Sequence, residues 1–353
     1  MSMKVSLWSF AVITCSCLVG TAWIVKGAPE DSASKLAARE KVLITEAYSL
    51  WSAVADEVWP GASALKAPFV YVGEHHEYAI GFPGALKGFT QTGDSLPDRR
   101  SIQVRQRTLH RDLSASFPLE GTPAVVMGSP EALGKSLGNW VITAGHEMFH
   151  VFQAANGAYD KAAELQIGPK GDSSWHLSFP FPYSDADVMR LIHLQGYLVW
   201  LAAQSSSTDE AVYNIGTAVD AARVYRSHLA HLRTDEKAYR YSQYQEWNEG
   251  VAAYFEYRFA QKAANGGYRP TQGFSSLPSF QRYEDLWREV YESRPFLAKH
   301  AGRAAKSRTA FYHLGAGKAL ALDKADPGWK KRYFAPGLWL DDLLANVNGG
   351  AHP

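Results

Sequence analysis

The spacing of apolar residues changes once along the chain, near Asn139, and this change restricts the fold more than any other feature. Between residues 68 and 128, short apolar or alternating stretches are separated by clusters of glycine, proline and aspartate, a pattern typical of strands. After Asn139, apolar residues recur with a helical period almost to the C-terminus. This order indicates an α+β fold, in which a small mixed or antiparallel sheet is followed by a mainly helical region.

The expected elements follow from these periods. A first helix is expected before the sheet, over residues 33–58, because its apolar residues recur at helical spacing. Strands are expected at 69–72, 78–82, 101–107 and 124–127. The later helices are expected at 139–154, 185–204, 208–232, 242–263, 280–292 and 308–322.

The composition is that of an ordinary globular protein. The chain has 353 residues, of which 46% are hydrophobic and 20% are charged. This length suggests an N-terminal segment at 1–27, a helix-and-sheet subdomain at 28–130 and a helical subdomain at 131–345. Because 36 basic residues oppose 35 acidic ones, the formal charge is +1, and nothing indicates binding to nucleic acid.

The first 27 residues have the features of an export signal. Lys4 precedes an uncharged apolar stretch from Val5 to Val25, and small residues follow it. This stretch is close to the ~20 residues that span a bilayer, so an uncleaved membrane anchor is the alternative to a cleaved signal peptide. In either case we expect the rest of the chain to lie outside the cytoplasm, either periplasmic or secreted, with membrane contact only through the anchor.

Both cysteines of the chain, Cys15 and Cys17, lie inside this segment. A cleaved chain would contain no disulfide and no thiolate metal ligand. Its formal charge would be 34 − 35 = −1, because the lost segment holds two lysines and no acidic residue. We therefore expect a nearly neutral exported protein that is stabilised by its core or by a bound ion.

The segment from Trp140 to Gln153 contains the spacing His-Glu-x-x-His. On a helix, His146 and His150 lie on one face about one turn apart, close enough to share a metal ion. Glu147 projects beside the vacant position, where it can take a proton from water that the metal activates. A chain of this composition contains the pattern by chance only about 0.02 times. We expect Asn139 to cap the start of this helix.

A catalytic zinc site needs a third protein ligand and an open position. The segment 246–257 contains Asn248-Glu249-Gly250-Val251-Ala252-Ala253-Tyr254. Here the chain resembles the gluzincin metallopeptidases, the thermolysin and aminopeptidase N group, in which Asn-Glu-Gly-x-Ala-x-Tyr on a second helix supplies the third ligand. The resemblance implies a zincin-like catalytic core in which Glu249 binds zinc. Glu246, one turn earlier on the same face, is the alternative ligand.

Gly250 agrees with a close contact at this segment. A glycine inside a helix costs ~1 kcal/mol relative to alanine, a cost that often reflects the close approach of another element. We expect that element to be the helix that carries His146.

A further fragment, Phe311-Tyr312-His313-Leu314-Gly315-Ala316, resembles the Tyr-x-x-Gly-Ala segment of aminopeptidase N-like enzymes. The resemblance implies that the Tyr312 hydroxyl hydrogen-bonds the oxyanion of the tetrahedral intermediate. Two features depart from those enzymes. The 98 residues between His150 and Glu249 require a helical insertion at about 158–240, and the Gly-x-Met-Glu-Asn segment is absent, so aminopeptidase specificity is not implied.

Three other patterns have simpler interpretations. The donors at 74–77 lie between two expected strands, where a polar turn is favoured over a second metal site. His228 and His231 are favoured as parts of a solvated helix face. Gly134-Lys135-Ser136-Leu137-Gly138 matches Gly-x-Ser-x-Gly, but that motif needs a strand immediately before it, and residues 130–133 favour helix or loop.

Together these features predict an exported zinc-dependent hydrolase, most simply a metallopeptidase with a peptide or protein substrate. Zn²⁺ would be bound by His146, His150 and Glu249, while Glu147 would act as the general base and Tyr312 would stabilise the oxyanion.

The strand at 124–127 is expected to border the cleft and to pair with an extended peptide. Two other functions remain open. One is a binding protein that keeps the metal for stability, against which an intact Glu147 argues. The other is a serine hydrolase that uses Ser136.

Overall fold

The computed structural model describes residues 35–169, 174–232, 235–292 and 307–347. One helix precedes a six-stranded sheet and further helices follow it, which confirms the α+β class. The expected export signal or anchor at 1–27, with both cysteines, lies outside the described residues. Within the described ranges, no helix combines the length and the apolarity that a membrane crossing requires.

The sheet is mixed but mostly antiparallel, with the strand order β3-β4-β2-β1-β6-β5. Its strands are β1 (Phe69–Val72), β2 (His76–Ile80), β3 (Thr90–Ser95), β4 (Ser101–Gln106), β5 (Ser114–Leu119) and β6 (Thr122–Gly128). β1 and β6 pair in parallel, with Val70 opposite Val126, and the other described pairs are antiparallel. As in any β-strand, alternate side chains face opposite sides of the sheet.

One side of the sheet packs on the helices. Phe69 and Tyr71 of β1 and Val125 of β6 belong to the main core, together with residues of the first helix. Their neighbours Val70 and Val126 face the other way, into a smaller core covered by loop residues. Each central strand is thus buried on both faces, which explains its nearly continuous apolar sequence.

The four expected strands are present, but β3 and β5 were not predicted. β5 corrects one expectation about the site. The strand at 124–127 is not free to pair with an extended peptide, because it lies inside β6, which pairs with β1 on one side and β5 on the other. β5 occupies the edge of the sheet instead, and it packs against the helix that carries His146.

The expected helices are present with shifted ends. Before the sheet lies α1 (Ala38–Val58). After it come α2 (Leu137–Ala155), α3 (Ala158–Glu164), α4 (Trp175–Ser178), α5 (Ala186–Gln204), α6 (Thr208–His231), α7 (Asp235–Gln245), α8 (Val251–Asn265), α9 (Gln272–Ser275), α10 (Tyr283–Leu286), α12 (Thr309–Ala325) and α13 (Leu340–Val347). Short 3₁₀ turns are η1 (Ala62–Ala64) and η4 (Trp329–Lys331), and π-helical turns are η2 (Glu246–Gly250) and η3 (Trp287–Glu292).

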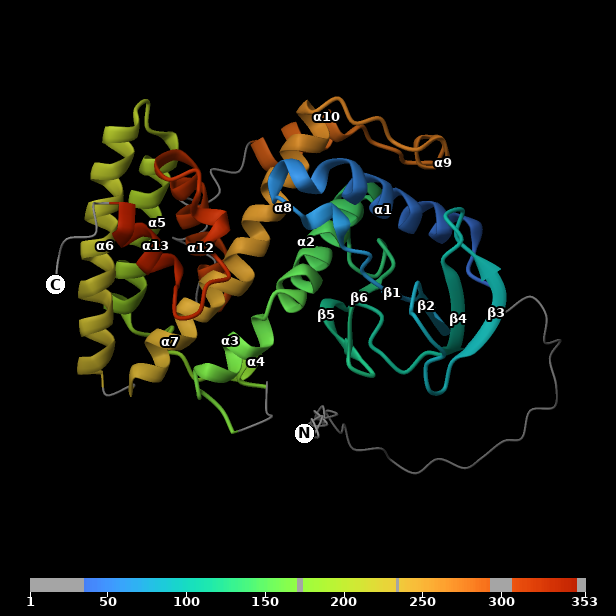
Figure 1. Ribbon diagram of the computed structural model, residues 1–353, viewed down its shortest axis with the longest axis horizontal. Helices are drawn as coiled ribbons and strands as arrows, with labels where there is room; N and C mark the ends of the chain where they lie inside the picture. The colour runs from blue at the N-terminus through green and yellow to red at the C-terminus, as the bar shows by residue number, and fades with distance from the viewer. Residues whose placement is uncertain (1–34, 170–173, 233–234, 293–306, 348–353) are drawn as a thin grey trace, which may run out of the picture.

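The helices form two groups around α8, which runs through the middle of the molecule (Figure 1). On one side, α2 and α1 lie between α8 and the sheet; on the other, α12 packs against α8 and the hairpin of α5 and α6. The chain between α2 and α8 forms α3 to α7, so two segments about a hundred residues apart become direct neighbours.

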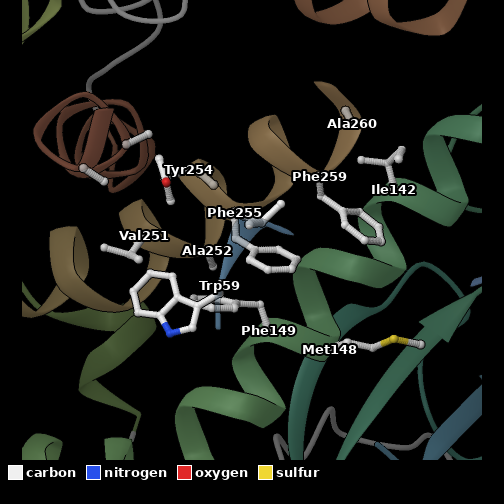
Figure 2. Close-up of a cluster of buried hydrophobic side chains, with 14 of the residues drawn as sticks. Trp59, Ile142, Met148, Phe149, Val251, Ala252, Tyr254, Phe255, Phe259 and Ala260 are labelled. Carbon is white, nitrogen blue, oxygen red and sulfur yellow. The ribbon is translucent and has the colours of Figure 1, made fainter. Parts of the chain in front are cut away.

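Aromatic side chains fill the contact between α2 and α8 (Figure 2). The rings of Phe149 and Phe255 stack with centroids 4.5 Å apart, and Phe255 stacks in turn on Phe259. All three rings are fully buried, and Trp59 packs against Phe149. Because each ring buries a large apolar area, this contact fixes how α2 and α8 are placed relative to each other.

Candidate metal centre

α2 presents His146, Glu147 and His150 to α8. Its first turn is capped by Ser136, whose hydroxyl oxygen accepts a hydrogen bond from the backbone N–H of Asn139 at 3.3 Å. The prediction that Asn139 caps this helix is therefore wrong, because the cap lies three residues earlier. The same cap gives Ser136 a structural role, and β6 ends at Gly128, so the strand that a serine-hydrolase elbow requires does not directly precede Ser136.

Glu249 lies in the π-helical turn η2, which connects α7 to α8 within one continuous helical stretch. A π-turn holds one extra residue per turn, and such turns are found frequently at functional sites because they redirect a side chain without ending the helix. Here the wider turn carries the whole Glu246–Gly250 segment.

Gly250 allows α12, rather than the His146 helix, to approach closely. A Cβ atom on Gly250 would lie 2.5 Å from Cα of Gly315 and 2.9 Å from the carbonyl oxygen of Phe311. The expectation that Gly250 makes room for α2 is therefore wrong. The glycine that brings α2 and α8 together is Gly145, where a Cβ would lie 2.5 Å from the ring of Phe259.

Three potential ligand atoms converge between α2 and η2. Nε2 of His150 lies 3.3 Å from Oε2 of Glu249, and Nε2 of His146 lies 3.9 Å from the same oxygen. The two imidazole rings are 4.9 Å apart and steeply inclined to each other. The three side chains are 10–18% exposed, so the group is largely enclosed.

The Nδ1 atom of His150 is held by the fully buried side chain of Gln153. The amide nitrogen of Gln153 donates to the Asn248 carbonyl at 3.0 Å, and a carbonyl can only accept. Its oxygen must therefore be the atom that lies 2.7 Å from Nδ1 of His150. Nδ1 thus carries the proton, which leaves the Nε2 lone pair of His150 directed toward Glu249.

The Nδ1 atom of His146 faces another carboxylate, that of Glu256 on α8, at 3.1 Å. Glu256 is itself held by the hydroxyl of Tyr291, which donates to it at 2.8 Å. This contact is an ion pair, and with a proton on Nδ1 the neutral His146 would have Nε2 available on the side of Glu249. The two histidines are thus oriented by two different side chains, Gln153 and Glu256.

The charges of the group are strongly coupled. Burial alone would lower the pKa of His146, but the hydrogen bond and charge of Glu256, with the charges of Glu147 and Glu249, raise it to about 9. Burial alone would raise the pKa of Glu249 and Glu256, but the neighbouring histidines lower both to about 2. Without a metal, the group therefore holds a positive imidazolium between carboxylates.

Glu147 lies beside this group with its side chain buried. Its Oε1 atom accepts a hydrogen bond from the Ser114 hydroxyl at 2.9 Å, and Ser114 is the first residue of the edge strand β5. Burial raises the pKa of Glu147 above its ordinary value, an effect that His146, His150 and the Ser114 hydroxyl only partly offset. A carboxylate with a raised pKa is a stronger proton acceptor than an exposed one.

Tyr312 also lies at the group. Burial first, and then the charge and hydrogen bond of Glu249, raise the pKa of Tyr312 well above its ordinary value. Its hydroxyl therefore stays protonated and can donate a hydrogen bond. Arg308, just before α12, lies over the Tyr312 ring and reaches Oε1 of Glu249 at 3.6 Å.

Glu246, the alternative ligand, lies elsewhere. Its buried carboxylate accepts from Nζ of Lys318 at 2.6 Å, and the same ammonium group also pairs with Asp341. Removal of a charge from water is tolerated when such partners are present. The structure thus brings Glu249, and not Glu246, to the two histidines.

The other sequence patterns stay apart from this group. In the 74–77 segment, His76 and Glu77 lie in β2, and buried Glu77 forms an ion pair at 2.6 Å with Arg105 on the neighbouring strand β4. His228 lies 3.2 Å from Asp185, the residue that caps α5. Asp187 is the third donor near that pair, but it is exposed and bonded to Arg190.

Sequence reasoning did not identify the residues that support the ligands. Gln153 is three positions after His150, and Glu256 is seven positions after Glu249, so each shares a helix face with the residue it follows. Their spacing from the ligands is a sequence signal from which Gln153 and Glu256 could have been predicted. Ser114 and Arg308 carry no such signal, because they reach the site from other elements.

Comparison of the chain with protein-family models, with curated proteins and with solved structures finds no match. The geometry of the site therefore carries the functional argument alone.

Proposed function

We propose that this protein is a zinc-dependent hydrolase that cleaves amide bonds in peptides. The observation that carries the proposal is the convergence of His146 Nε2 and His150 Nε2 on Oε2 of Glu249, with the buried carboxylate of Glu147 beside them. Structural zinc ions are enclosed by four protein ligands, whereas only three ligand atoms converge here and Glu147 stays outside that group, as expected at a catalytic site.

The donor set fits Zn²⁺. Two imidazole nitrogens and one carboxylate oxygen are the ligands of many catalytic zinc sites. Ligands about 2.1 Å from a tetrahedral zinc ion lie about 3.4 Å from each other, and the observed separations are 3.3 and 3.9 Å. The three ligand atoms all lie within 4.8 Å of one another, and His146 would have to move inward to bind the ion. The acceptors on both Nδ1 atoms support the same ligating nitrogens.

A zinc ion held by these residues would polarise a substrate carbonyl and lower the pKa of a water molecule. Glu147 supplies the proton acceptor that such a hydrolysis needs. With Oε1 held by Ser114, we assign the proton transfer to Oε2, from the attacking water and then to the leaving nitrogen. Tyr312, whose raised pKa keeps its hydroxyl protonated, can donate a hydrogen bond to the developing oxyanion.

The edge strand β5 supports a peptide as the substrate. It begins at Ser114, which contacts Glu147, so a peptide added to this edge would pass close to the general base. Addition of an extended chain to a sheet edge is a common form of peptide recognition. These features agree with a gluzincin-like core, and the apolar N-terminal segment supports export of the protein.

The direct test compares wild type with Glu147→Gln on a mixture of unstructured peptides. We expect the variant to bind the same amount of zinc but to lose about 10²–10⁴-fold in turnover, because the amide cannot accept a proton. Glu57→Gln, at an exposed ion pair with Lys262, is the matched control and should leave turnover unchanged.

Two outcomes would reject the proposal. Equal turnover in wild type and Glu147→Gln would exclude the assigned base. Zinc binding without any turnover in wild type would favour the alternative, a binding protein in which the metal is structural.

A further inference from the structure

Arg308 has a guanidinium group at the candidate metal centre without a hydrogen-bond acceptor in the described part of the chain. Its side chain is 34% exposed, and its nearest charged neighbour is Oε1 of Glu249, at 3.6 Å from Nη1. That separation is longer than an N–H···O hydrogen bond. The remaining contact is with the face of the Tyr312 ring, whose centre is 5.6 Å away.

Two comparable arginines of the chain are satisfied. Arg105, 25% exposed, donates to Glu77 at 2.6 Å, and Arg258, 31% exposed, donates to Asp323 at 3.0 Å. A guanidinium group with five N–H donors is normally paired when it is this far buried, because unmade hydrogen bonds of a charged group are costly. Arg308 differs from both because its carboxylate neighbour, Glu249, lies at 3.6 Å, too far to accept a hydrogen bond.

The surroundings of Arg308 suit an anionic group. Phe311, three residues after Arg308, packs against Tyr183 and Tyr241, whose hydroxyl oxygens are 3.5 Å apart. Glu249 is only a partial counter-ion, since a metal bound at its Oε2 atom would neutralise its charge. This step rests on the proposed function. With the metal present, the guanidinium group is left without an anionic partner of its own.

We propose that Arg308 binds a carboxylate of the substrate, so that the protein acts on peptides with a carboxylate close to the bond that is cut. The planar guanidinium fork matches a carboxylate in a two-bond arrangement. Arg308 adjoins a proposed metal ligand, so the carboxylate must lie within about two residues of that bond. Its source is either the free C-terminus of the peptide or an acidic side chain.

The test uses three peptides of one sequence: one with a free C-terminus, one with an amidated C-terminus, and one amidated but with glutamate as its last residue. Each is assayed for kcat/KM with wild type, Arg308→Gln and Arg308→Lys. Each is also titrated into the zinc-loaded Glu147→Gln protein by calorimetry, which measures binding without turnover. Arg223→Gln, at an exposed pair on α6, is the control.

We expect wild type to favour a carboxylate-bearing peptide over the plain amide by about 10- to 100-fold, in both kcat/KM and affinity. Arg308→Gln should abolish this preference, and Arg308→Lys should keep part of it. Zinc content is measured for each variant. Where it is unchanged, a loss of the carboxylate preference reflects substrate binding and not loss of the metal. Preference for the first peptide alone identifies the C-terminus as the source, and preference for the third identifies a side chain.

Equal binding and turnover of all three peptides, unchanged by Arg308→Gln, would overturn the inference and leave the hydrolase proposal standing. Carboxylate-dependent binding without hydrolysis would support the role of Arg308 and reject the hydrolase proposal. Absence of both binding and hydrolysis with every peptide would reject both proposals.

Discussion

His150 and Gln153 form a link between the two segments that meet at the candidate metal centre. Oε1 of Gln153 lies 2.7 Å from Nδ1 of His150, while the amide nitrogen of the same residue donates to the Asn248 carbonyl in η2. That nitrogen also donates to the hydroxyl of Tyr333 at 2.7 Å. One buried side chain on α2 thus orients a proposed ligand and holds the turn that carries Glu249.

Replacement of Gln153 by leucine should weaken zinc binding by about 10- to 100-fold, as is typical for residues that orient a ligand. Leucine has a similar size but can neither accept from His150 nor donate to Asn248. Competition with a fluorescent chelator measures the affinity. Gln204→Leu, at the exposed end of α5, is the control, and equal affinities in the two variants would contradict the assigned role.

Glu256→Gln should also weaken zinc binding, because His146 loses a charged acceptor and keeps only a neutral one. Tyr291→Phe, which removes the hydroxyl that holds Glu256, should have the same effect in smaller measure. In the metal-free protein, the pKa of His146 should fall from about 9 in the Glu256→Gln variant. NMR titration of the imidazole measures this shift, and an unchanged pKa would show that Glu256 does not act on His146.

Gly250→Ala and Gly315→Ala should each destabilise the protein by about 1–3 kcal/mol, the usual cost of overpacking. A Cβ atom on Gly315 would lie 2.3 Å from the Glu246 carbonyl oxygen, so η2 and α12 would have to separate. Gly196→Ala is the matched control on α5, because a Cβ there meets nothing within 4 Å. It should be neutral or stabilising, since alanine favours the helix.

Urea denaturation of the three glycine variants measures these differences. Loss of zinc affinity in Gly250→Ala is expected as well, because the π-turn positions Glu249. A stable Gly250→Ala protein would show that α12 and η2 are not packed as closely as described.

The pH dependence of zinc binding should differ from that of a free histidine, for which affinity weakens below about 6.5. Zinc binds only the neutral imidazole, so below the raised pKa of His146, about 9, the metal must displace a proton. Affinity should therefore rise with pH up to about 9 and then level off. Calorimetric titrations at several pH values test this, and a plateau that begins near pH 6.5 would contradict it.

The metal-free protein should show the opposite trend in stability. A histidine whose pKa is raised on folding stabilises the folded state fully below its unfolded value of about 6.5. This contribution is lost as the pH rises through about 9. Thermal unfolding of the apoprotein is measured at pH 6 and pH 9.5 and compared with the same measurement on His146→Gln. The loss of stability between the two pH values should be larger in wild type than in the variant, and equal losses would contradict the prediction.

The helices and central strands could be predicted because burial imposes a period on their sequences. Each central strand expected from its apolar residues is present, whereas β3 and β5 were missed. Both lie at the edges of the sheet. β3 is Thr-Gln-Thr-Gly-Asp-Ser and contains no apolar residue, so it lacks the alternation that marks a strand. β5 alternates from Ser114 to Phe117, but Pro118 interrupts the pattern, and a proline inside a short run argues against a strand.

The site shows the same division between local and distant information. The pairing of His146 with His150 depends on one helix, so spacing predicts it directly. The choice of Glu249 over Glu246 depends on how a π-turn rotates the two carboxylates, which a regular helical period does not describe. Contacts such as Glu147 with Ser114 join distant segments, and no local pattern contains them.

Zinc content is the measurement that tests the central claim most directly. Purified wild type, dialysed after exposure to zinc, is measured by mass spectrometry beside Glu249→Ala and Glu246→Gln. We expect about one zinc ion per chain in wild type, loss of most of it in Glu249→Ala, and retention in the folded fraction of Glu246→Gln, whose partner is Lys318. Wild type without zinc, or full retention in Glu249→Ala together with loss in Glu246→Gln, would contradict the proposed centre.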